Sequence, residues 1–249
     1  MNTWVGIGRS EIGLVRHSNQ DAFVSIDSSC LWAVADGMGG HAGGEVAAQT
    51  AIASIKARAE LTIDNLRQGH SAPSDFLSDV IAQAHHAILR KATIEPALKG
   101  MGTTVVLLLM HAQPIPTAHI AHLGDSRAYV FRAGVLTPLT RDHTLIEKYL
   151  DRGILTPKAA RTHPERHVLT QALGVPSPLK PSVSSHPVKP DDIFLLCSDG
   201  LTKMLEDEDI RKICSRDHGD PIRTCDSLID ESLNRGGADN VTVVVIAPI

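Results

Sequence analysis

Aromatic residues are scarce in this chain, at 3% of 249 residues, and basic residues do not outnumber acidic ones. The net charge of -4 gives no general attraction to nucleic acid or to an anionic membrane surface. The few aromatic rings also provide no platform on which unpaired bases could stack. We therefore expect a protein that binds neither nucleic acid nor membrane.

Paired cysteines and long apolar runs are missing as well. The four cysteines contain no CxxC pair, and two of them lie in apolar, strand-like runs where a thiol packs as a small hydrophobic group. The longest strongly apolar run, residues 105–110, is far too short to cross a bilayer, and residues 1–20 lack the apolar segment of a secretory leader. We expect reduced cysteines and a cytoplasmic location.

The remaining composition is that of a globular domain, with 43% hydrophobic residues. No Ser/Gly-rich linker, repeat or low-complexity block divides the sequence. We therefore interpret residues 1–249 as a single domain.

Strand-like runs come in consecutive groups rather than in alternation with helices, which favours antiparallel sheets and an α+β sandwich. Helices are predicted at residues 44–66 and 74–91, the second with an apolar face typical of a helix that covers a sheet, and two more between 207 and 234. Residues 133–134 suggest a hairpin turn. The predicted strands are residues 4–7, 22–26, 31–35, 103–110, 117–123, 128–132, 193–197 and 241–246.

The stretch from about residue 144 to residue 191 differs from the rest, because it holds seven prolines, several cations and few strand patterns. It is predicted to be an ordered surface insertion with one or two short helices. Two interpretations stay open: a flap beside the site that guides an anionic substrate, or an inert solvated insertion.

Four aspartates, each beside glycine, serine or asparagine, form the most informative pattern. Asp36, Asp125 and Asp199 each follow an apolar run directly, and Asp239 precedes the last such run. One aspartate after a strand commonly just starts a turn. Four carboxylates gathered at strand ends would repel one another unless hard divalent cations neutralised them. The set therefore predicts a metal site.

Polar residues near the first aspartate suggest an anion site. Arg16 lies in a polar turn before a strand, where its guanidinium could hold two phosphate oxygens in a bidentate fork. Asp21 could orient a metal-bound water without touching the ion. Gly37 allows the backbone to approach a ligand and turn a carbonyl towards it.

The same glycine-rich segment also fits a dinucleotide fingerprint. Gly37, Gly39 and Ala42 match its spacing and lie between a strand and a helix. However, Asp36 would face the pyrophosphate, and the region about 20 residues further on is predicted helix rather than a strand that ends in an acid. A nucleotide site is therefore the weaker hypothesis.

Further blocks complete an ordered series across the chain. Taken together, they resemble the metal-dependent protein Ser/Thr phosphatases of the type 2C (PPM) family, in its compact bacterial form, from about residue 6 to residue 246. The blocks are Gly100-Met101-Gly102-Thr103-Thr104, Gly124-Asp125-Ser126-Arg127, Ser198-Asp199-Gly200-Leu201-Thr202 and Gly237-Ala238-Asp239-Asn240-Val241-Thr242.

The resemblance implies two antiparallel sheets packed as a sandwich with helices on both sides, in α-β-β-α layers, and a site at one end. It also implies two or three Mn²⁺ or Mg²⁺ ions. Asp36 would bridge two of them, with the Gly37 carbonyl, Asp199 and Asp239 as further ligands, and Asp125 would join Asp199 at a weaker third position. Oxygen ligands suit such hard ions.

The implied activity is hydrolysis of phosphoserine and phosphothreonine in proteins, as a phosphoric monoester hydrolase. A water that bridges the metals would attack phosphorus directly, while Arg16 would grip the phosphate and Asn240 would lie beside the last metal ligand. Expected partners are phosphorylated proteins and a cognate Ser/Thr kinase pathway, and we expect a monomer.

One position departs from the family pattern. Some eukaryotic members place a histidine, the proposed general acid, directly after the Asp-Gly step, where this chain has Met38. His41 or a metal-bound water could protonate the leaving group instead. His85 and His86, on a predicted helix, lack ligand spacing and are expected at the surface. The alternative function is a pseudo-phosphatase that binds phosphoproteins in signalling, although such a module would not need the carboxylate cluster.

Overall fold

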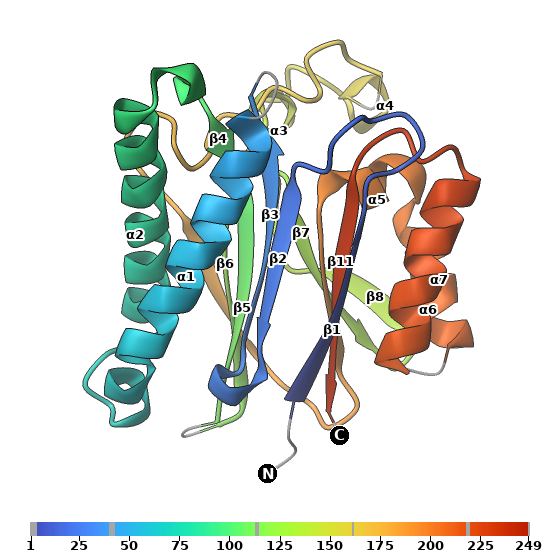
Figure 1. Ribbon diagram of the computed structural model, residues 1–249. Coiled ribbons are helices and arrows are strands. Elements are labelled where there is room, and N and C mark those ends of the chain that lie inside the picture. The colour runs from blue at the N-terminus through green and yellow to red at the C-terminus, as the bar shows by residue number, and fades with distance from the viewer. Residues whose placement is uncertain (1–3, 40–42, 113–114, 161, 218–219, 249) are drawn as a thin grey trace.

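The computed structural model describes residues 4–39, 43–112, 115–160, 162–217 and 220–248. Two antiparallel β-sheets pack face to face, and helices cover both outer faces (Figure 1). The first sheet has the order β1-β11-β10-β7-β8, with β1 at Trp4–Glu11, β7 at Arg127–Arg132, β8 at Val135–Pro138, β10 at Ile193–Cys197 and β11 at Val241–Pro248.

The second sheet has the order β2-β3-β5-β6-β9. Its strands are β2 at Asp21–Ile26, β3 at Leu31–Met38, β5 at Val105–His111, β6 at Thr117–Leu123 and β9 at Ser182–Pro187, and the short β4 at Gly102–Thr103 pairs with the end of β3. Both sheets are antiparallel throughout, so the predicted α+β sandwich is confirmed.

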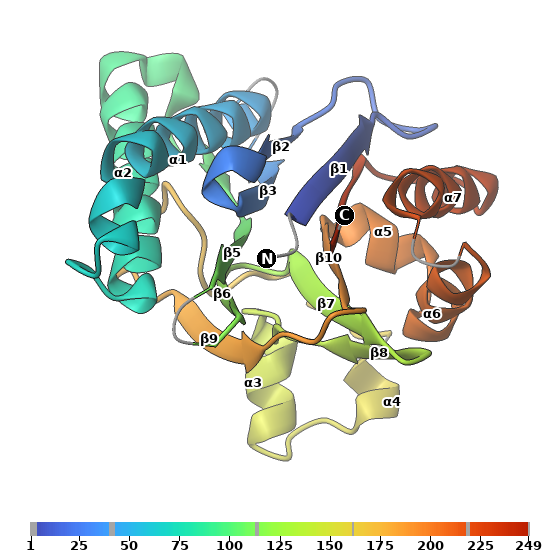
Figure 2. The same cartoon turned by 90° about the horizontal axis from the view of Figure 1, so that it is seen from below.

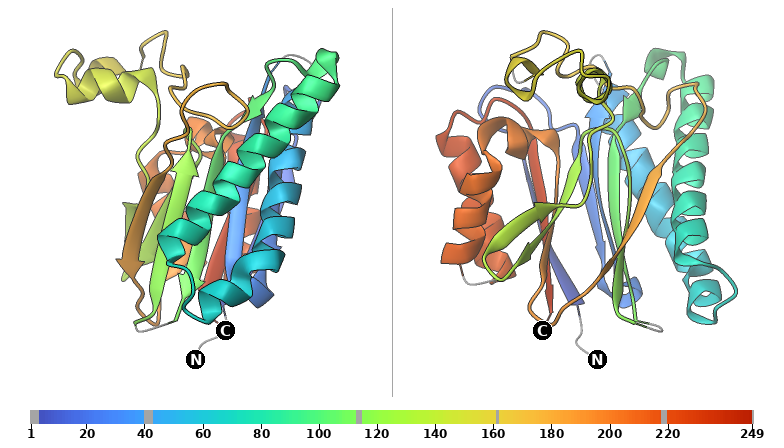
Figure 3. Two further views of the ribbon diagram at one scale, coloured as in Figure 1. Left: turned by 90° about the vertical axis from the view of Figure 1, so that its left-hand side faces the viewer. Right: turned by 180° about the vertical axis from the view of Figure 1, so that it is seen from behind.

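Helices lie in separate groups on the two outer faces, as the view from below makes clear (Figure 2). Helices α1, Gly43–Arg67, and α2, Pro73–Ile94, cover the second sheet. Helices α5, Asp199–Met204, α6, Asp207–Arg216, and α7, Pro221–Asn234, cover the first. Two short helices, α3 at Leu145–Asp151 and α4 at Pro157–Ala160, stand off beyond one end of the sandwich (Figure 3). Single 3₁₀ turns occupy Asp27–Ser29 and Pro96–Leu98.

Three apolar layers follow from this arrangement. The middle layer lies between the sheets and includes Trp32, Phe194 and Val244, all nearly inaccessible to solvent. The outer layers join each sheet to its helices. The predicted apolar face of α2 is buried at every position, namely Leu77, Val80, Ile81, Ala84 and Ile88.

Strand direction decides where the four aspartates lie. Asp36 lies near the end of β3, and Asp199 follows β10 after a single residue, Ser198. Because β11 runs antiparallel to β10, Asp239, just before β11, lies at the same end as Asp199. Asp125 occupies the turn between β6 and β7 at this end too. The sandwich therefore gathers all four aspartates at one end.

Three features differ from the sequence predictions. Strand β9 lies inside the 144–191 stretch and pairs with β6; it was missed because it is a largely exposed edge strand of polar residues. The short helix α5 was not predicted. His85 is buried rather than at the surface, since its Nδ1 accepts a hydrogen bond of 3.2 Å from the Gly174 N–H.

The predicted hairpin turn is confirmed. Residues Ala133 and Gly134, both with positive φ, form the turn between β7 and β8. The four cysteines are free. In the part of the chain that the structure describes, no helix has the length and apolar character needed to span a membrane.

Candidate active site

Asp36 and Gly37 lie at the end of β3, beside the first residue of β2. Asp36 is the register partner of Asp21, and Gly37 pairs with Thr103 of β4. A Cβ atom at Gly37 would lie 2.1 Å from the Gly44 carbonyl oxygen and 2.6 Å from that of Gln20. Only glycine fits between these two segments.

Two threonines of the block at residues 100–104 hold the Asp36 backbone in place. The Thr104 hydroxyl accepts a hydrogen bond of 3.1 Å from the Asp36 N–H, and the Thr103 hydroxyl donates one of 2.9 Å to the Asp36 carbonyl. The Thr104 hydroxyl lies 2.6 Å from that of Ser126, next to Asp125. These blocks therefore connect two of the aspartates through short polar contacts.

Asp21 is buried beside Asp36, its register partner on the neighbouring strand. Its Oδ2 accepts hydrogen bonds of 2.7 Å from the Ser198 and Thr242 hydroxyls, whereas Oδ1 has no partner in the structure as described. Burial raises the pKa of Asp21 to about 6; the two hydroxyls oppose the rise, and the charges of Asp199 and Asp239 add to it. A buried carboxylate with one unsatisfied oxygen is suited to orient a water or ion beside it.

Two cations meet the carboxylates of Asp199 and Asp239. Lys203 Nζ lies 2.6 Å from Asp199 Oδ2 and 2.7 Å from Asp239 Oδ2. The Arg16 guanidinium forms a fork on Asp239, with Nε 2.8 Å from Oδ1 and Nη2 2.9 Å from Oδ2. Burial acts to raise the pKa of Asp239, but Lys203, a hydrogen bond from the Asn240 N–H and the charge of Arg16 together hold the value below its usual range.

Asn240 fixes the turn that carries Arg16. Its amide nitrogen donates hydrogen bonds of 2.9 Å to the Ile12 and Ser18 carbonyls, and its amide oxygen accepts one of 2.9 Å from the Gln20 N–H. All three backbone groups lie in or beside the β1–β2 turn, so Asn240 positions Arg16 relative to Asp239.

Asp36 and Asp125 lie where a negative charge is poorly stabilised. Burial raises the pKa of Asp36 well above its usual range, and the charges of Asp21, Asp199 and Asp125 add to the rise. Burial, with Asp199 as the next cause, raises the pKa of Asp125 to about 7. Both carboxyls therefore resist ionisation unless a cation approaches.

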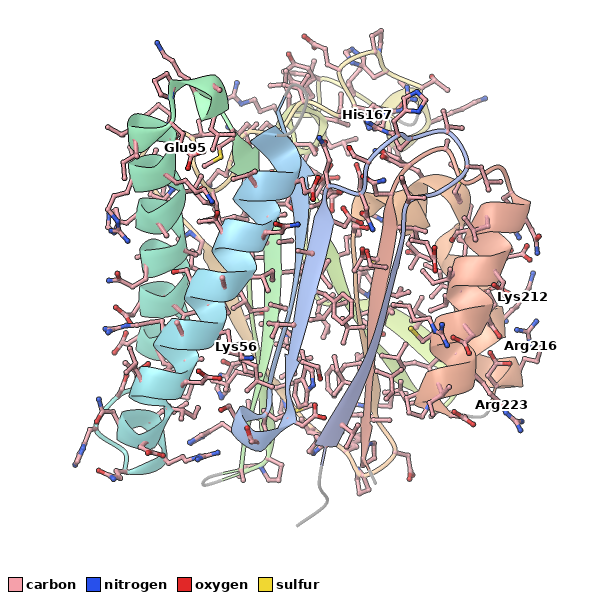
Figure 4. The ribbon with its side chains drawn as sticks, in the orientation of Figure 1. Lys56, Glu95, His167, Lys212, Arg216 and Arg223 are labelled. Carbon is pink, nitrogen blue, oxygen red and sulfur yellow. The ribbon has the colours of Figure 1, made fainter. Side chains whose placement is uncertain are left out.

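A cavity of about 490 Å³ lies over this cluster. Arg16, Lys203 and the four aspartates line one side, and residues from the 144–191 stretch, including His167 and Gln171, line the other. Figure 4 shows His167 at the same end of the molecule as the β1–β2 turn. The stretch therefore borders the cavity. His41 lies outside the described residues.

The donor chemistry suits divalent cations. The aspartates offer hard oxygen atoms, and the pKa values of Asp36 and Asp125 are raised by burial and further by like charges, which a cation would neutralise. As the side chains are placed, no three or more histidine, cysteine, aspartate or glutamate residues among those described form a ready metal cage. Lys203 and Arg16 instead provide the positive charge at Asp199 and Asp239.

The structure brings together every described residue of the predicted site: Arg16, Asp21, Asp36, Gly37, Asp125, Asp199, Asp239 and Asn240. Sequence reasoning missed Lys203 and His167. Lys203 lies four residues after Asp199, a spacing that puts two residues on one face of a helix, but the helix was too short to predict. Nothing in the sequence around His167 indicates its place at the cavity.

Comparison with known proteins gives consistent matches over nearly the whole chain. The family described as Protein phosphatase 2C matches residues 8–239. The serine/threonine protein phosphatase PstP of Mycobacterium tuberculosis is 36% identical over 95% of this chain, which spans only 43% of that relative. The serine/threonine phosphatase stp of Listeria monocytogenes is 32% identical, over 96% of this chain and 93% of that relative.

A solved structure matches in three dimensions as well. It is the catalytic domain of the serine/threonine protein phosphatase PstP in complex with two manganese ions. The two chains are 34% identical, with a TM-score of 0.81, and the match covers 99% of this chain and all of the other.

Proposed function

Since this chain belongs to the protein phosphatase 2C family, we propose that it is a metal-dependent phosphatase that removes phosphate from phosphoserine and phosphothreonine in proteins. The observation that carries the proposal is the convergence of four aspartates and Arg16 on one cavity. Sheet pairing, Asn240 and the two threonines hold this arrangement, so it does not depend on mobile surface groups.

The metal ligands in this proposal are Asp36, the Gly37 carbonyl, Asp199 and Asp239 for two Mn²⁺ or Mg²⁺ ions, with Asp125 and Asp199 at a third position. When bound, such ions lower the pKa of a coordinated water and neutralise charge on a phosphoryl group. Asp21 is buried beside Asp36, and one of its oxygens has no partner in the structure as described, so it orients water next to the metal ligands.

Arg16 binds the substrate phosphate. Its side chain is half exposed and now forms a fork on Asp239, a geometry that a phosphate can match with two of its oxygens. Metal binding at Asp239 would release this guanidinium towards the cavity. Asn240 holds the turn, so Arg16 stays beside the reacting phosphate.

In this proposal a single catalytic domain extends over residues 1–249. The flap is shorter than the predicted range of 144–191, because residues 182–187 form β9. The flap's contribution of His167 and Gln171 to the cavity wall supports a role beside the substrate. The donor of the leaving-group proton is His41 or a water. Phosphoprotein substrates, a kinase pathway, a cytoplasmic location and a monomeric state stay predictions.

The test is hydrolysis of a phosphothreonine peptide and of p-nitrophenyl phosphate by the wild type and Asp239→Asn, with Mn²⁺, with Mg²⁺ and with EDTA. We expect activity only with a divalent ion, and a loss of about a hundredfold or more in the variant, because a lost ligand costs at least as much as a lost supporting contact. Asp64→Asn, at an exposed aspartate of α1, is the matched control.

Metal-independent hydrolysis, or a correctly folded protein that leaves every phosphopeptide intact with Mn²⁺, would contradict the proposal. A phosphotyrosine peptide of the same sequence measures the selectivity for serine and threonine.

A further inference from the structure

Lys203 is the most deeply placed cation at the site. It lies on α5, one helical turn after Asp199, and its ammonium bridges Asp199 Oδ2 and Asp239 Oδ2 at 2.6 and 2.7 Å. Its side chain is 27% exposed, whereas that of Arg16 is 50% exposed. Arg16 can therefore swing into solvent, but Lys203 remains over the two carboxylates.

The backbone around Lys203 cannot withdraw easily. Leu201 is fully buried in the layer beneath α5, and a Cβ atom at Gly200 would lie 1.9 Å from the Asn240 carbonyl oxygen, so α5 packs directly against the chain next to Asp239. This packing holds the backbone of Lys203 in place, so its side chain always extends from the same position. Any cation that binds Asp199 and Asp239 must therefore compete with this ammonium for their carboxylate oxygens.

Building on the metal site of the proposed function, we infer that Lys203 is a resident cation of the acid cluster, which neutralises Asp199 and Asp239 without metal and competes with divalent cations for them. Two consequences follow. The folded protein tolerates its clustered acids when metal is absent, and it binds divalent ions more weakly than the aspartates alone would.

Lys203→Met removes the charge and keeps the length of the side chain, and Lys203→Arg keeps the charge. Lys212→Met is the control, since Lys212 projects from α6 into solvent away from the site (Figure 4) and is 63% exposed. Each metal-free protein is titrated with Mn²⁺ in a calorimeter, and its thermal midpoint is measured in EDTA and in saturating Mn²⁺.

We expect Lys203→Met to bind Mn²⁺ about tenfold more tightly than the wild type, because a unit charge a few ångströms away in a partly buried site is worth at least that factor. Its midpoint in EDTA falls below that of the wild type, and Mn²⁺ raises it by more. Lys203→Arg and Lys212→Met stay close to the wild type in Mn²⁺ affinity.

Equal or weaker Mn²⁺ binding by Lys203→Met would overturn the inference, while tight wild-type binding would leave the proposed metal site intact. A wild type that binds no Mn²⁺ would overturn both. Because these readouts are affinity and thermal stability, they do not depend on the phosphatase assay.

Discussion

Replacing Asp21 with asparagine is predicted to stabilise the metal-free protein at alkaline pH, although it removes a buried, hydrogen-bonded side chain. Asparagine keeps the shape of Asp21 and, with its amide oxygen in the place of Oδ2, it keeps the acceptor for both the Ser198 and the Thr242 hydroxyl. It removes a carboxylate that is buried near Asp36, Asp199 and Asp239.

The magnitude follows from the pKa of Asp21, which burial raises from 3.8 to about 6. Below pH 4 the carboxyl is protonated in both the folded and the unfolded protein. Between about pH 4 and pH 6 the folded protein keeps a proton that the unfolded chain has lost, so the free energy of unfolding falls as pH rises. Above about pH 6 the carboxyl is ionised in both states, and the buried charge then lowers the free energy of unfolding by its full amount, about 3 kcal/mol.

The new amide loses about 1 kcal/mol of this gain, because its NH₂ group takes the place of Oδ1, which is buried and has no hydrogen-bond partner in the structure as described. We therefore expect the free energy of unfolding in EDTA to be about 2 kcal/mol higher for Asp21→Asn than for the wild type at pH 8, and less than about 1 kcal/mol higher at pH 5. Saturating Mn²⁺ should abolish the advantage, since ions neutralise the cluster.

Urea denaturation in EDTA at pH 5 and pH 8 measures both differences, with the exposed Asp64→Asn as the control. A variant less stable than the wild type at pH 8 would refute the reasoning. So would a difference that is the same at both pH values, because the effect would then be a lost contact rather than a lost charge.

Two substitutions test the backbone of the site. Gly37→Ala should lower the free energy of unfolding by about 3 kcal/mol or more, since its Cβ would meet backbone atoms at 2.1 and 2.6 Å. Gly43→Ala is the control and should be tolerated, because the nearest contact of its Cβ is at 3.4 Å. Urea denaturation compares the two variants with the wild type. Asn240→Ala should raise KM for a phosphopeptide more than it lowers kcat, because it releases the turn that carries Arg16. The lost hydrogen bonds should also lower the free energy of unfolding by about 2 kcal/mol. The exposed Asn234→Ala is its control, and unchanged kinetics for Asn240→Ala would contradict the role given to Asn240.

The place of the aspartates could be predicted from the sequence because it depends only on strand order and direction. Asp36 and Asp199 follow apolar runs, and Asp239 precedes one that pairs antiparallel with the run before Asp199. Apolar runs of this kind are among the clearest patterns in a sequence. The pattern predicted a cluster at strand ends, and the resemblance to the PPM family implied that this cluster lies at one end of the sandwich.

The surroundings of the aspartates could not be predicted in the same way. The hydroxyls that hold Asp21 belong to Ser198 and Thr242, 177 and 221 positions away along the chain. The bridge formed by Lys203 depends on a six-residue helix, and β9 is a polar edge strand with no apolar alternation. Each of these features depends on tertiary contacts rather than on a local pattern.

Position and charge are controlled by different parts of the site. Uncharged groups fix the backbone: Thr103 and Thr104 hold Asp36, and Asn240 holds the turn of Arg16. Charge is left unbalanced at Asp36 and Asp125, whose pKa values are raised by burial and by their acidic neighbours. Because the geometry does not rely on ion pairs, divalent cations could replace Lys203 and Arg16 at the carboxylates without dismantling the frame that holds them.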